Sequence, residues 1–350
     1  FRRSQRLPRV PSFTGKRCAS VTSERGGPPA LFDKRLLVVV GKGGVGKTTV
    51  SCALALEAAA RGRRVLVAEV DGAGRAAALF GVRPEALGEA RRVRESLSVM
   101  SIDGTAALEE YLQSIIQAKR LVRAVFRSQI YRYFVAAAPG LKELMTIGKI
   151  WYEADRVDPA TGRAQWDTVI LDAPATGHGL QYLGMPRAAH DVFSAGLVGS
   201  ESRRLIELLT DPRRCAVNLV TTAEEMPFNE TVEMYDRLRG SLRMPLGYLF
   251  VNRVHASEIG AEDVEALAAA LASTAEPSPC FVDALDWARE EVGWATINRS
   301  YLEKMAERMP LPRIDIPFIF GDEFAAEQLQ QVAAGIAAAM EASNPVKPND

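Results

Sequence analysis

A glycine-rich segment, Gly41–Thr49 with the sequence GKGGVGKTT, constrains this chain more than any other feature. It follows the apolar run Leu36–Val40 and precedes the helix-favouring stretch Val50–Ala60, which predicts a strand, a tight loop and a helix in succession. Glycines let successive backbone N–H groups turn inward around phosphate oxygens, and the start of a helix adds its dipole. In this pattern Lys47 reaches the outer phosphates of a nucleotide, and the hydroxyl of Thr48 is a ligand for Mg²⁺. The segment therefore predicts a nucleoside triphosphate site formed by Gly43, Gly44, Val45, Gly46, Lys47, Thr48 and Thr49.

The charges of the chain balance overall but are unevenly spread. Residues 1–32 carry seven basic groups against Glu24 alone, so the remainder has a slight excess of acidic groups. An acidic body argues against nucleic acid as a partner. No apolar run approaches the roughly 18 residues that a membrane-spanning helix needs. The 350 residues are enough for one large domain or two small ones.

The two ends of the chain lack apolar periodicity. We expect a disordered basic tail at residues 1–33 and a short disordered tail at residues 343–350. The first of these is rich in Arg, contains Ser and is poor in acidic residues, which is the composition of an organellar transit peptide. An incidental extension is the alternative interpretation.

The four cysteines, Cys18, Cys52, Cys215 and Cys280, are widely separated and form no C-x-x-C pair. This spacing does not indicate a disulfide framework, and we expect a reducing compartment, namely the cytoplasm. It does not support a zinc site either, so no zinc is expected. Buried structural thiols are the favoured interpretation, and a cluster formed in space is the alternative.

Short β-rich runs alternate with helical stretches, which predicts an α/β fold with a doubly wound, mostly parallel sheet. Most of the runs end in a polar residue, at the edge where such sheets bind ligands. After the first strand the expected strands are Val65–Glu69, Leu97–Ile102, Thr168–Asp172, Ala216–Thr221, Gly247–Asn252 and Arg313–Ile316. Two Ala-rich stretches, Ala266–Ala272 and Val332–Met340, favour helix.

Two further helical intervals, residues 106–155 and 186–209, do not simply return to the sheet. We expect them to form a helical subdomain at the sheet edge, inside one domain that spans residues 34–342. The first interval is rich in aromatic residues, including Tyr131, Phe134 and Trp151. The stretch Tyr131–Trp151 is either ordinary core or an exposed apolar groove for a hydrophobic client.

A second lysine in the loop, Lys42, indicates which class of nucleoside triphosphate-binding protein this chain resembles. The sequence G-K-G-G-x-G-K-T-T resembles the deviant phosphate-binding loop of dimeric ATPases that include the arsenite-pump and tail-anchored-protein targeting ATPases. The resemblance implies a homodimer that closes around ATP, with Lys42 crossing to the nucleotide of the partner. A solvated loop lysine is the alternative interpretation. The absence of a C-x-x-C pair separates this chain from the zinc-linked form of the targeting ATPase.

The segment Glu69–Arg75 resembles the first switch of this family. The match implies that Asp71 directs the attacking water, so Lys42, Lys47 and Asp71 are the expected catalytic residues. The alternative is that Asp71 caps a helix. The chain departs from the family pattern at Gly72, which replaces proline, and at Gly74 and Arg75.

The segment Asp172–His178, with the sequence DAPATGH, resembles the second switch of the family. An aspartate at a strand end beside a phosphate loop holds Mg²⁺ directly or through water, so Thr48 and Asp172 are the expected metal ligands. The match also implies that Thr176, Gly177 and His178 respond to the γ-phosphate. A structural role for His178 is equally consistent with its position.

The remaining matches to the family concern the adenine base of the nucleotide. The resemblance implies that Asn252, at a strand end, reads the adenine edge, and that Pro317 and Phe318 pack on the adenine ring. An amide offers both a donor and an acceptor, which suits adenine; the alternative is a turn residue.

These features predict a Mg²⁺-dependent ATPase in which hydrolysis switches the helical subdomain. The switch would serve the binding and targeting of a hydrophobic or membrane-protein client. Two alternatives remain open: an ATPase subunit of an anion or metalloid extrusion system, which would need a membrane partner, and an ATP-dependent metabolic enzyme.

Overall fold

The computed structural model of the protein describes residues 31–72, 74–115, 140–257, 259–274, 278–321 and 323–343. The expected tails, apart from residues 31–33 and 343, lie outside these ranges. So does most of the aromatic stretch expected between Tyr131 and Trp151, including Tyr131, Tyr133 and Phe134.

One sheet organises the molecule. In the part of the chain that the structure describes, its eight strands are β1 (Leu36–Gly41), β2 (Val65–Val70), β3 (Ala90–Arg94), β4 (Leu97–Ile102), β5 (Thr168–Asp172), β6 (Cys215–Thr222), β7 (Leu246–Val254) and β8 (Arg313–Pro317). They lie in the order β3-β4-β2-β5-β1-β6-β7-β8, and every neighbouring pair is parallel except β3 and β4. The expected α/β fold with a mostly parallel sheet is confirmed.

The strands that sequence reasoning expected all occur, within one or two residues of the expected bounds. Strand β3 was missed. Its sequence, ARRVR, is charged and largely exposed, as is usual for a strand at the edge of a sheet. Such a strand carries no apolar run that a sequence pattern would detect.

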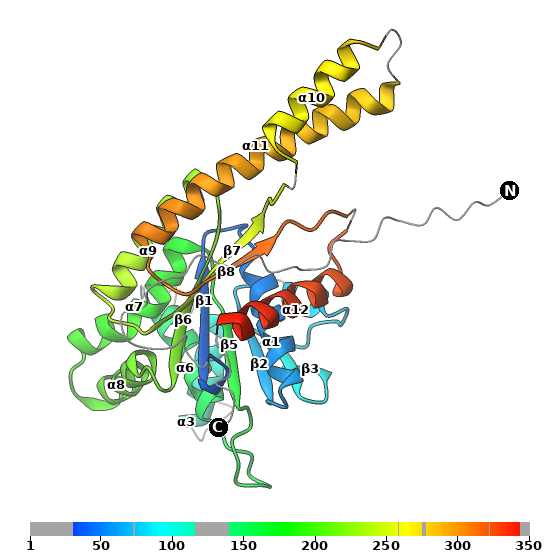
Figure 1. Cartoon of the computed structure of the whole chain (residues 1–350). Helices are drawn as coiled ribbons and strands as arrows, with labels where there is room; N and C mark the ends of the chain where they lie inside the picture. The colour runs from blue at the N-terminus through cyan, green and yellow to red at the C-terminus, as the bar shows by residue number, and fades with distance from the viewer. Residues whose placement is uncertain are drawn as a thin grey trace, which may run out of the picture.

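Alternate residues of the strands enter two cores, because side chains of a strand point to opposite faces. Leu36, Val38 and Val40 of β1 belong to one core, whereas Leu37 and Val39 belong to the other. The second core is closed by α1 (Lys47–Ala60), α2 (Arg75–Leu79), α12 (Ala326–Ser343) and the short 3-10 helix η1 (Leu31–Asp33). Figure 1 shows α1 and α12 side by side on this face.

The first core is covered by α3 (Gly104–Ile115), α6 (Leu141–Asp155), α7 (Thr176–Val192), α8 (Gly196–Thr210) and α9 (Glu225–Arg239). Helices α6, α7 and α8 contain the described parts of the two helical intervals. Their apolar residues, such as Ile150, Leu183 and Leu208, share one core with β1, β2 and β5. The described parts of these helices therefore pack on one face of the sheet, because their buried stripes meet the apolar face that the strands present.

A helical hairpin extends away from this body. Helix α10 (Ala261–Ala272) and the 30-residue α11 (Pro279–Arg308) follow β7, and their connected ends project furthest from the sheet (Figure 1). We call α10 and the first half of α11, residues 261–294, the arm. None of the described helices is both long and apolar enough to cross a lipid bilayer.

Candidate functional site

The glycine-rich loop joins β1 to α1 at the carboxyl edge of the sheet. Gly46 is the N-cap of α1 and has a φ of 96°, a conformation that favours glycine. A side chain at Gly46 would also collide with the amide of Asn252, which comes from β7. The last glycine of the motif is therefore required twice, once by the turn and once by the close approach of β7.

Lys47 lies at the start of α1 with its ammonium group turned back into the loop. Its Nζ donates a hydrogen bond to the carbonyl oxygen of Lys42 at 3.0 Å. Burial lowers the pKa of Lys47, and the carboxylate of Asp172 partly offsets this effect. A partly desolvated ammonium group within the ring of loop carbonyls and amides is placed to meet a phosphate group.

Thr48 and Asp172 meet where α1 begins and β5 ends. The hydroxyl of Thr48 donates to Oδ2 of Asp172 at 2.6 Å, and the hydroxyl of Ser51 lies 3.4 Å from Oδ1. Asp172 is 4% exposed, and burial raises its pKa to about 6. One hydroxyl and one carboxylate fit Mg²⁺, which takes oxygen ligands and fills its other positions with water and phosphate oxygens.

Asp71 follows β2 in a left-handed conformation with a φ of 51°. Its Oδ2 accepts a hydrogen bond of 2.6 Å from the hydroxyl of Tyr182, which lies on α7. Asp71 does not cap α2; the carboxylate of Glu69 does, because it accepts from the backbone N–H groups of Arg75 and Ala76. The carboxylate expected to direct water is thus exposed and hydrogen-bonded to α7, the helix that begins within the second switch segment.

Gly72, where the family pattern has proline, lies against the side chain of Glu69. A Cβ at Gly72 would overlap the carboxyl group of Glu69, which is buried and engaged with α2. This departure from the pattern therefore has a local cause: the capping role of Glu69 leaves no space for a larger residue.

The second switch segment runs beside the loop. A Cβ placed on Gly43 would lie 3.6 Å from the Cβ of Ala175, which is ordinary contact. Thr176 is the first residue of α7, and Gly177 and His178 are exposed in its first turn. The backbone N–H groups of this helix start are therefore next to the phosphate loop.

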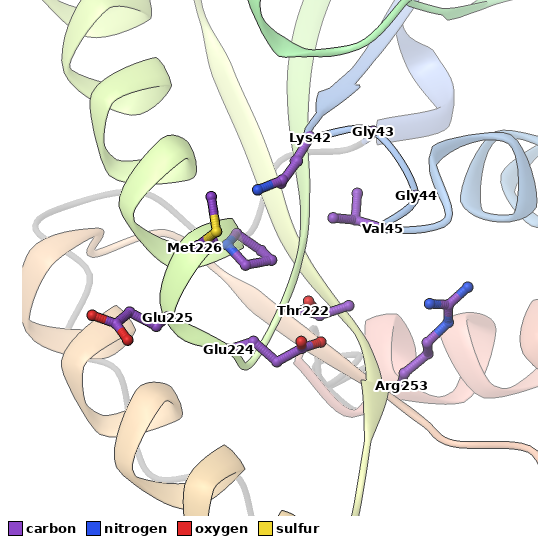
Figure 2. Close-up of a pocket in the computed structure, with 10 residues that line it drawn as sticks. Lys42, Gly43, Gly44, Val45, Thr222, Glu224, Glu225, Met226 and Arg253 are labelled. Atoms are coloured by element: carbon purple, nitrogen blue, oxygen red, sulfur yellow. The ribbon is translucent and has the colours of Figure 1, made fainter.

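A pocket with a volume of about 460 Å³ opens on the outer side of the loop. Figure 2 shows Lys42 extending from the loop towards Met226, at the start of α9, while Arg253 comes from β7. Nζ of Lys42 pairs with Oε1 of Glu230 on α9 at 2.8 Å. The pocket is lined by Lys42, Gly43, Gly44, Val45, Thr222, Glu224, Glu225, Met226, Pro227 and Arg253.

The residues expected at the base lie at the ends of β7 and β8. Nδ2 of Asn252 donates to the carbonyl oxygen of Val45 at 2.9 Å, so the side chain supports the phosphate loop in this structure. Pro317 is the last residue of β8, and the N–H of Phe318 donates to the carbonyl oxygen of Val254 at 3.0 Å. Phe318 and Asn252 are therefore brought to neighbouring strand ends.

Several residues of the site carried no signal in the sequence. Tyr182, Glu230 and His255 make contacts that join helices to strand ends far away in the chain, the last of these through Glu291 on α11. Arg253 has a φ of 56°, which a sequence pattern does not reveal in a non-glycine residue. Among the described residues no group of three or more His, Cys, Asp or Glu side chains is placed to hold a metal ion.

The fold and the phosphate loop define the class: a P-loop ATPase built on a mostly parallel sheet. A family model for anion-transporting ATPases matches residues 34–197 of the chain. The ATPase BagA of Mycobacterium tuberculosis is 31% identical over 314 residues, which covers 85% of this chain and 91% of that protein.

Two further relatives bear different names. The arsenical pump-driving ATPase of Escherichia coli is 27% identical over 266 residues, covering 69% of this chain and 42% of that protein. The ATPase get3 of Schizosaccharomyces japonicus is 32% identical over 169 residues, covering 48% of each. The chain belongs to the anion-transporting ATPase family, and the expected ATPase activity agrees with that membership.

Proposed function

We propose that this ATPase depends on Mg²⁺, works as a homodimer gated by its nucleotide, and uses hydrolysis to bind and deliver a hydrophobic protein client. The observation that carries the proposal is the 2.6 Å contact between Thr48 and Asp172 beside the phosphate loop. It joins the hydroxyl and the carboxylate that a P-loop ATPase uses for its metal. We expect the protein to act in the cytoplasm.

The chemistry follows from positions around the loop. Backbone N–H groups of the loop bind the phosphates, and Lys47 stabilises the charge that develops on the γ-phosphoryl group. Mg²⁺ held by Thr48 and Asp172 would neutralise charge on the β- and γ-phosphates. Asp71 orients the attacking water, and its bond to Tyr182 restricts its carboxylate to one direction. Loss of the γ-phosphate releases the helix start at Thr176 and Gly177.

The position of Lys42 favours the homodimer hypothesis. Its side chain extends from the loop along the pocket towards α9 and pairs there with Glu230, so it can meet a surface that closes over this pocket (Figure 2). Lys42→Ala should retain nucleotide binding and lose most hydrolysis, about a hundredfold, as when one transition-state donor is removed. Lys34→Ala, just before the other end of β1, is the control and should hydrolyse ATP normally. Unchanged turnover in Lys42→Ala would refute the dimeric mechanism.

The client hypothesis gains support from the turn between α7 and α8. Val192, Phe193 and Val198 are exposed there, within the second helical interval. Such a group of apolar side chains suits an apolar peptide.

The client test uses purified protein, Mg²⁺-ATP and a peptide with one C-terminal membrane-spanning segment. We expect the protein to keep this peptide soluble with ATP but not with ADP. The double variant Val192→Ser, Phe193→Ser should lose capture, whereas Trp287→Ser in the arm should keep it. Capture that is equal in every nucleotide state, or in both variants, would contradict the proposal.

The names of the arsenical pump-driving relatives favour a second candidate, the ATPase subunit of a metalloid extrusion system. The two functions separate in one assay of ATP turnover. Stimulation by arsenite or antimonite without capture of the peptide would select extrusion. Stimulation by the peptide alone would select the client function.

A further inference from the structure

His255, the first residue after β7, joins the loop expected at the base to the long helix α11. Its ring stacks on Phe318 with centroids 4.6 Å apart and 22° between the ring planes. On Trp294 of α11 the corresponding values are 5.8 Å and 23°. Phe320 meets Phe318 edge-on at 4.9 Å. The Phe318 ring is therefore held on one face by His255 and at its side by Phe320.

Polar contacts fix the imidazole in this position. Nδ1 of His255 lies 2.8 Å from Oε2 of Glu291, one turn before Trp294 on α11. The backbone N–H of His255 donates to Oδ1 of Asn298 at 2.8 Å, and Nδ2 of Asn298 donates to the carbonyl oxygen of Ala223 after β6. Asn298 is 2% exposed. Both the backbone and the ring of His255 are thus anchored to the same helix, which is itself tied to the carboxyl edge of the sheet.

We infer that His255 is a positioning residue for nucleotide binding: it holds Phe318 in the orientation in which that ring receives the base. The inference rests on the proposed function, because it needs ATP as the ligand, and on the expectation from the family resemblance that Phe318 packs on adenine. A ring already ordered before binding loses less conformational freedom when the base arrives. The stacking also links the base to α11, because a base on Phe318 changes the surroundings of the His255 ring, and that ring stacks on Trp294.

Two variants distinguish the contribution of the His255 ring from that of its hydrogen bond to Glu291. His255→Gln keeps an amide within reach of Glu291 and loses the ring, whereas His255→Phe keeps the ring and loses the bond. We expect His255→Gln to raise the KM for ATP by up to about tenfold with kcat within twofold, since a Phe318 ring that is no longer held loses its stacking on the base, which is worth about this much. His255→Phe should restore most of the affinity. A KM that is unchanged in His255→Gln would overturn the inference.

A matched control addresses a role in folding alone. Tyr301 is also on α11 and contacts Phe228 at 5.6 Å between ring centroids. Tyr301→Leu should lower the melting temperature and leave the KM for ATP unchanged. An equal rise of KM in Tyr301→Leu would show that His255 only stabilises α11, and would refute the positioning role.

The change in tryptophan fluorescence on addition of ATP is a measurement that a loss of stability alone does not alter. Addition of ATP should change the emission of the wild-type protein and of Trp287→Phe, but not that of Trp294→Phe. The inference fails if Trp294→Phe keeps the full change. It fails separately from the proposed function if ATP is hydrolysed in a Lys47-dependent manner while His255→Gln and Phe318→Leu bind ATP normally. If the wild-type protein does not bind ATP, both are wrong.

Discussion

The phosphate-loop region and the arm use apolar residues in opposite ways. In α1, which follows the loop, Val50, Cys52 and Leu54 are each 0% exposed. In the arm the described part of α10 buries only Val264, while Phe281 and Trp287 of α11 are 61% and 75% exposed. Both regions begin at the carboxyl edge of the sheet. Helix α1 then packs against a face of the sheet, whereas the arm projects away from it (Figure 1).

The difference shows which part of the molecule each region depends on. Helix α1 is held between the sheet and α12, so its side chains are fixed by the whole fold. The arm depends on contacts within its own hairpin and on the base of α11, where Asn298 and Met305 are buried. We therefore expect changes in the arm to leave folding nearly unaffected, and changes near the loop to alter both folding and chemistry.

The largest expected effect comes from matched truncations in the two regions. Leu54→Ala opens a cavity in a closed core and should lower the free energy of unfolding by about 2–5 kcal/mol. Trp287→Ala removes a side chain that is mostly in water and should change it by less than about 0.5 kcal/mol. Urea denaturation followed by circular dichroism measures both. Similar losses for the two variants would remove the distinction between core and arm.

A second prediction concerns the buried carboxylate of the site. Burial raises the pKa of Asp172 in the folded protein to about 6, well above the ordinary range of a carboxyl group, so keeping this group ionised above pH 6 opposes folding. Without nucleotide and in the presence of EDTA, Asp172→Asn should be more stable than wild type at pH 7 by about 3 kcal/mol, while hydrolysing ATP at least a hundredfold more slowly.

The pH dependence of that gain gives the check. As pH falls through 6 towards 4, Asp172 takes up its proton in the folded protein and the penalty disappears, so the two proteins should converge. Denaturation curves at pH 7 and pH 4.5 measure the gap. A gap that is absent at pH 7, or that widens in acid, would contradict the role of burial.

A smaller effect is expected at Gly72. In Gly72→Ala the new methyl group must displace the carboxyl group of Glu69 from the N-terminus of α2, at a cost of about 1–2 kcal/mol. The variant should also hydrolyse ATP more slowly, because Asp71 is the neighbouring residue. The double variant Glu69→Ala, Gly72→Ala provides the control: it should cost no more than Glu69→Ala alone. Full additivity of the two costs would show that the residues do not compete for space.

The contrast also explains what the sequence could and could not predict. The loop, the strands and the separate assignments of Thr48 and Asp172 as metal ligands depend on local patterns: a glycine spacing, apolar runs, and polar residues at strand ends. The place of α6, α7 and α8 over a sheet face depends on which apolar stripe meets which strand, and an amphipathic helix pattern is compatible with several positions. The sequence predicted helix at Ala266–Ala272, yet nothing in that pattern says that the helix projects from the body.

At the site, the residues that sequence patterns missed are those defined by long-range contacts. Tyr182 reaches Asp71 from a helix more than a hundred residues away in the chain. Asn252 was expected at the adenine edge, and its contact with Val45 became visible only when β7 was placed beside the loop. The adenine contact itself stays a prediction.

The cysteines test the same comparison without disturbing stability. Cys52 and Cys215 are buried in the body, and burial raises the pKa of Cys215 to about 12, whereas Cys280 is exposed in the arm. Thiolate is the reactive form, so Cys280 should react with Ellman's reagent at least about a hundred times faster than either buried thiol in the native protein. In a Cys18→Ser background one thiol should react rapidly, none should do so in the further variant Cys280→Ser, and denaturant should release the rest. Rapid labelling of two thiols in the native state would mean that the body opens as readily as the arm, and would end the distinction between them.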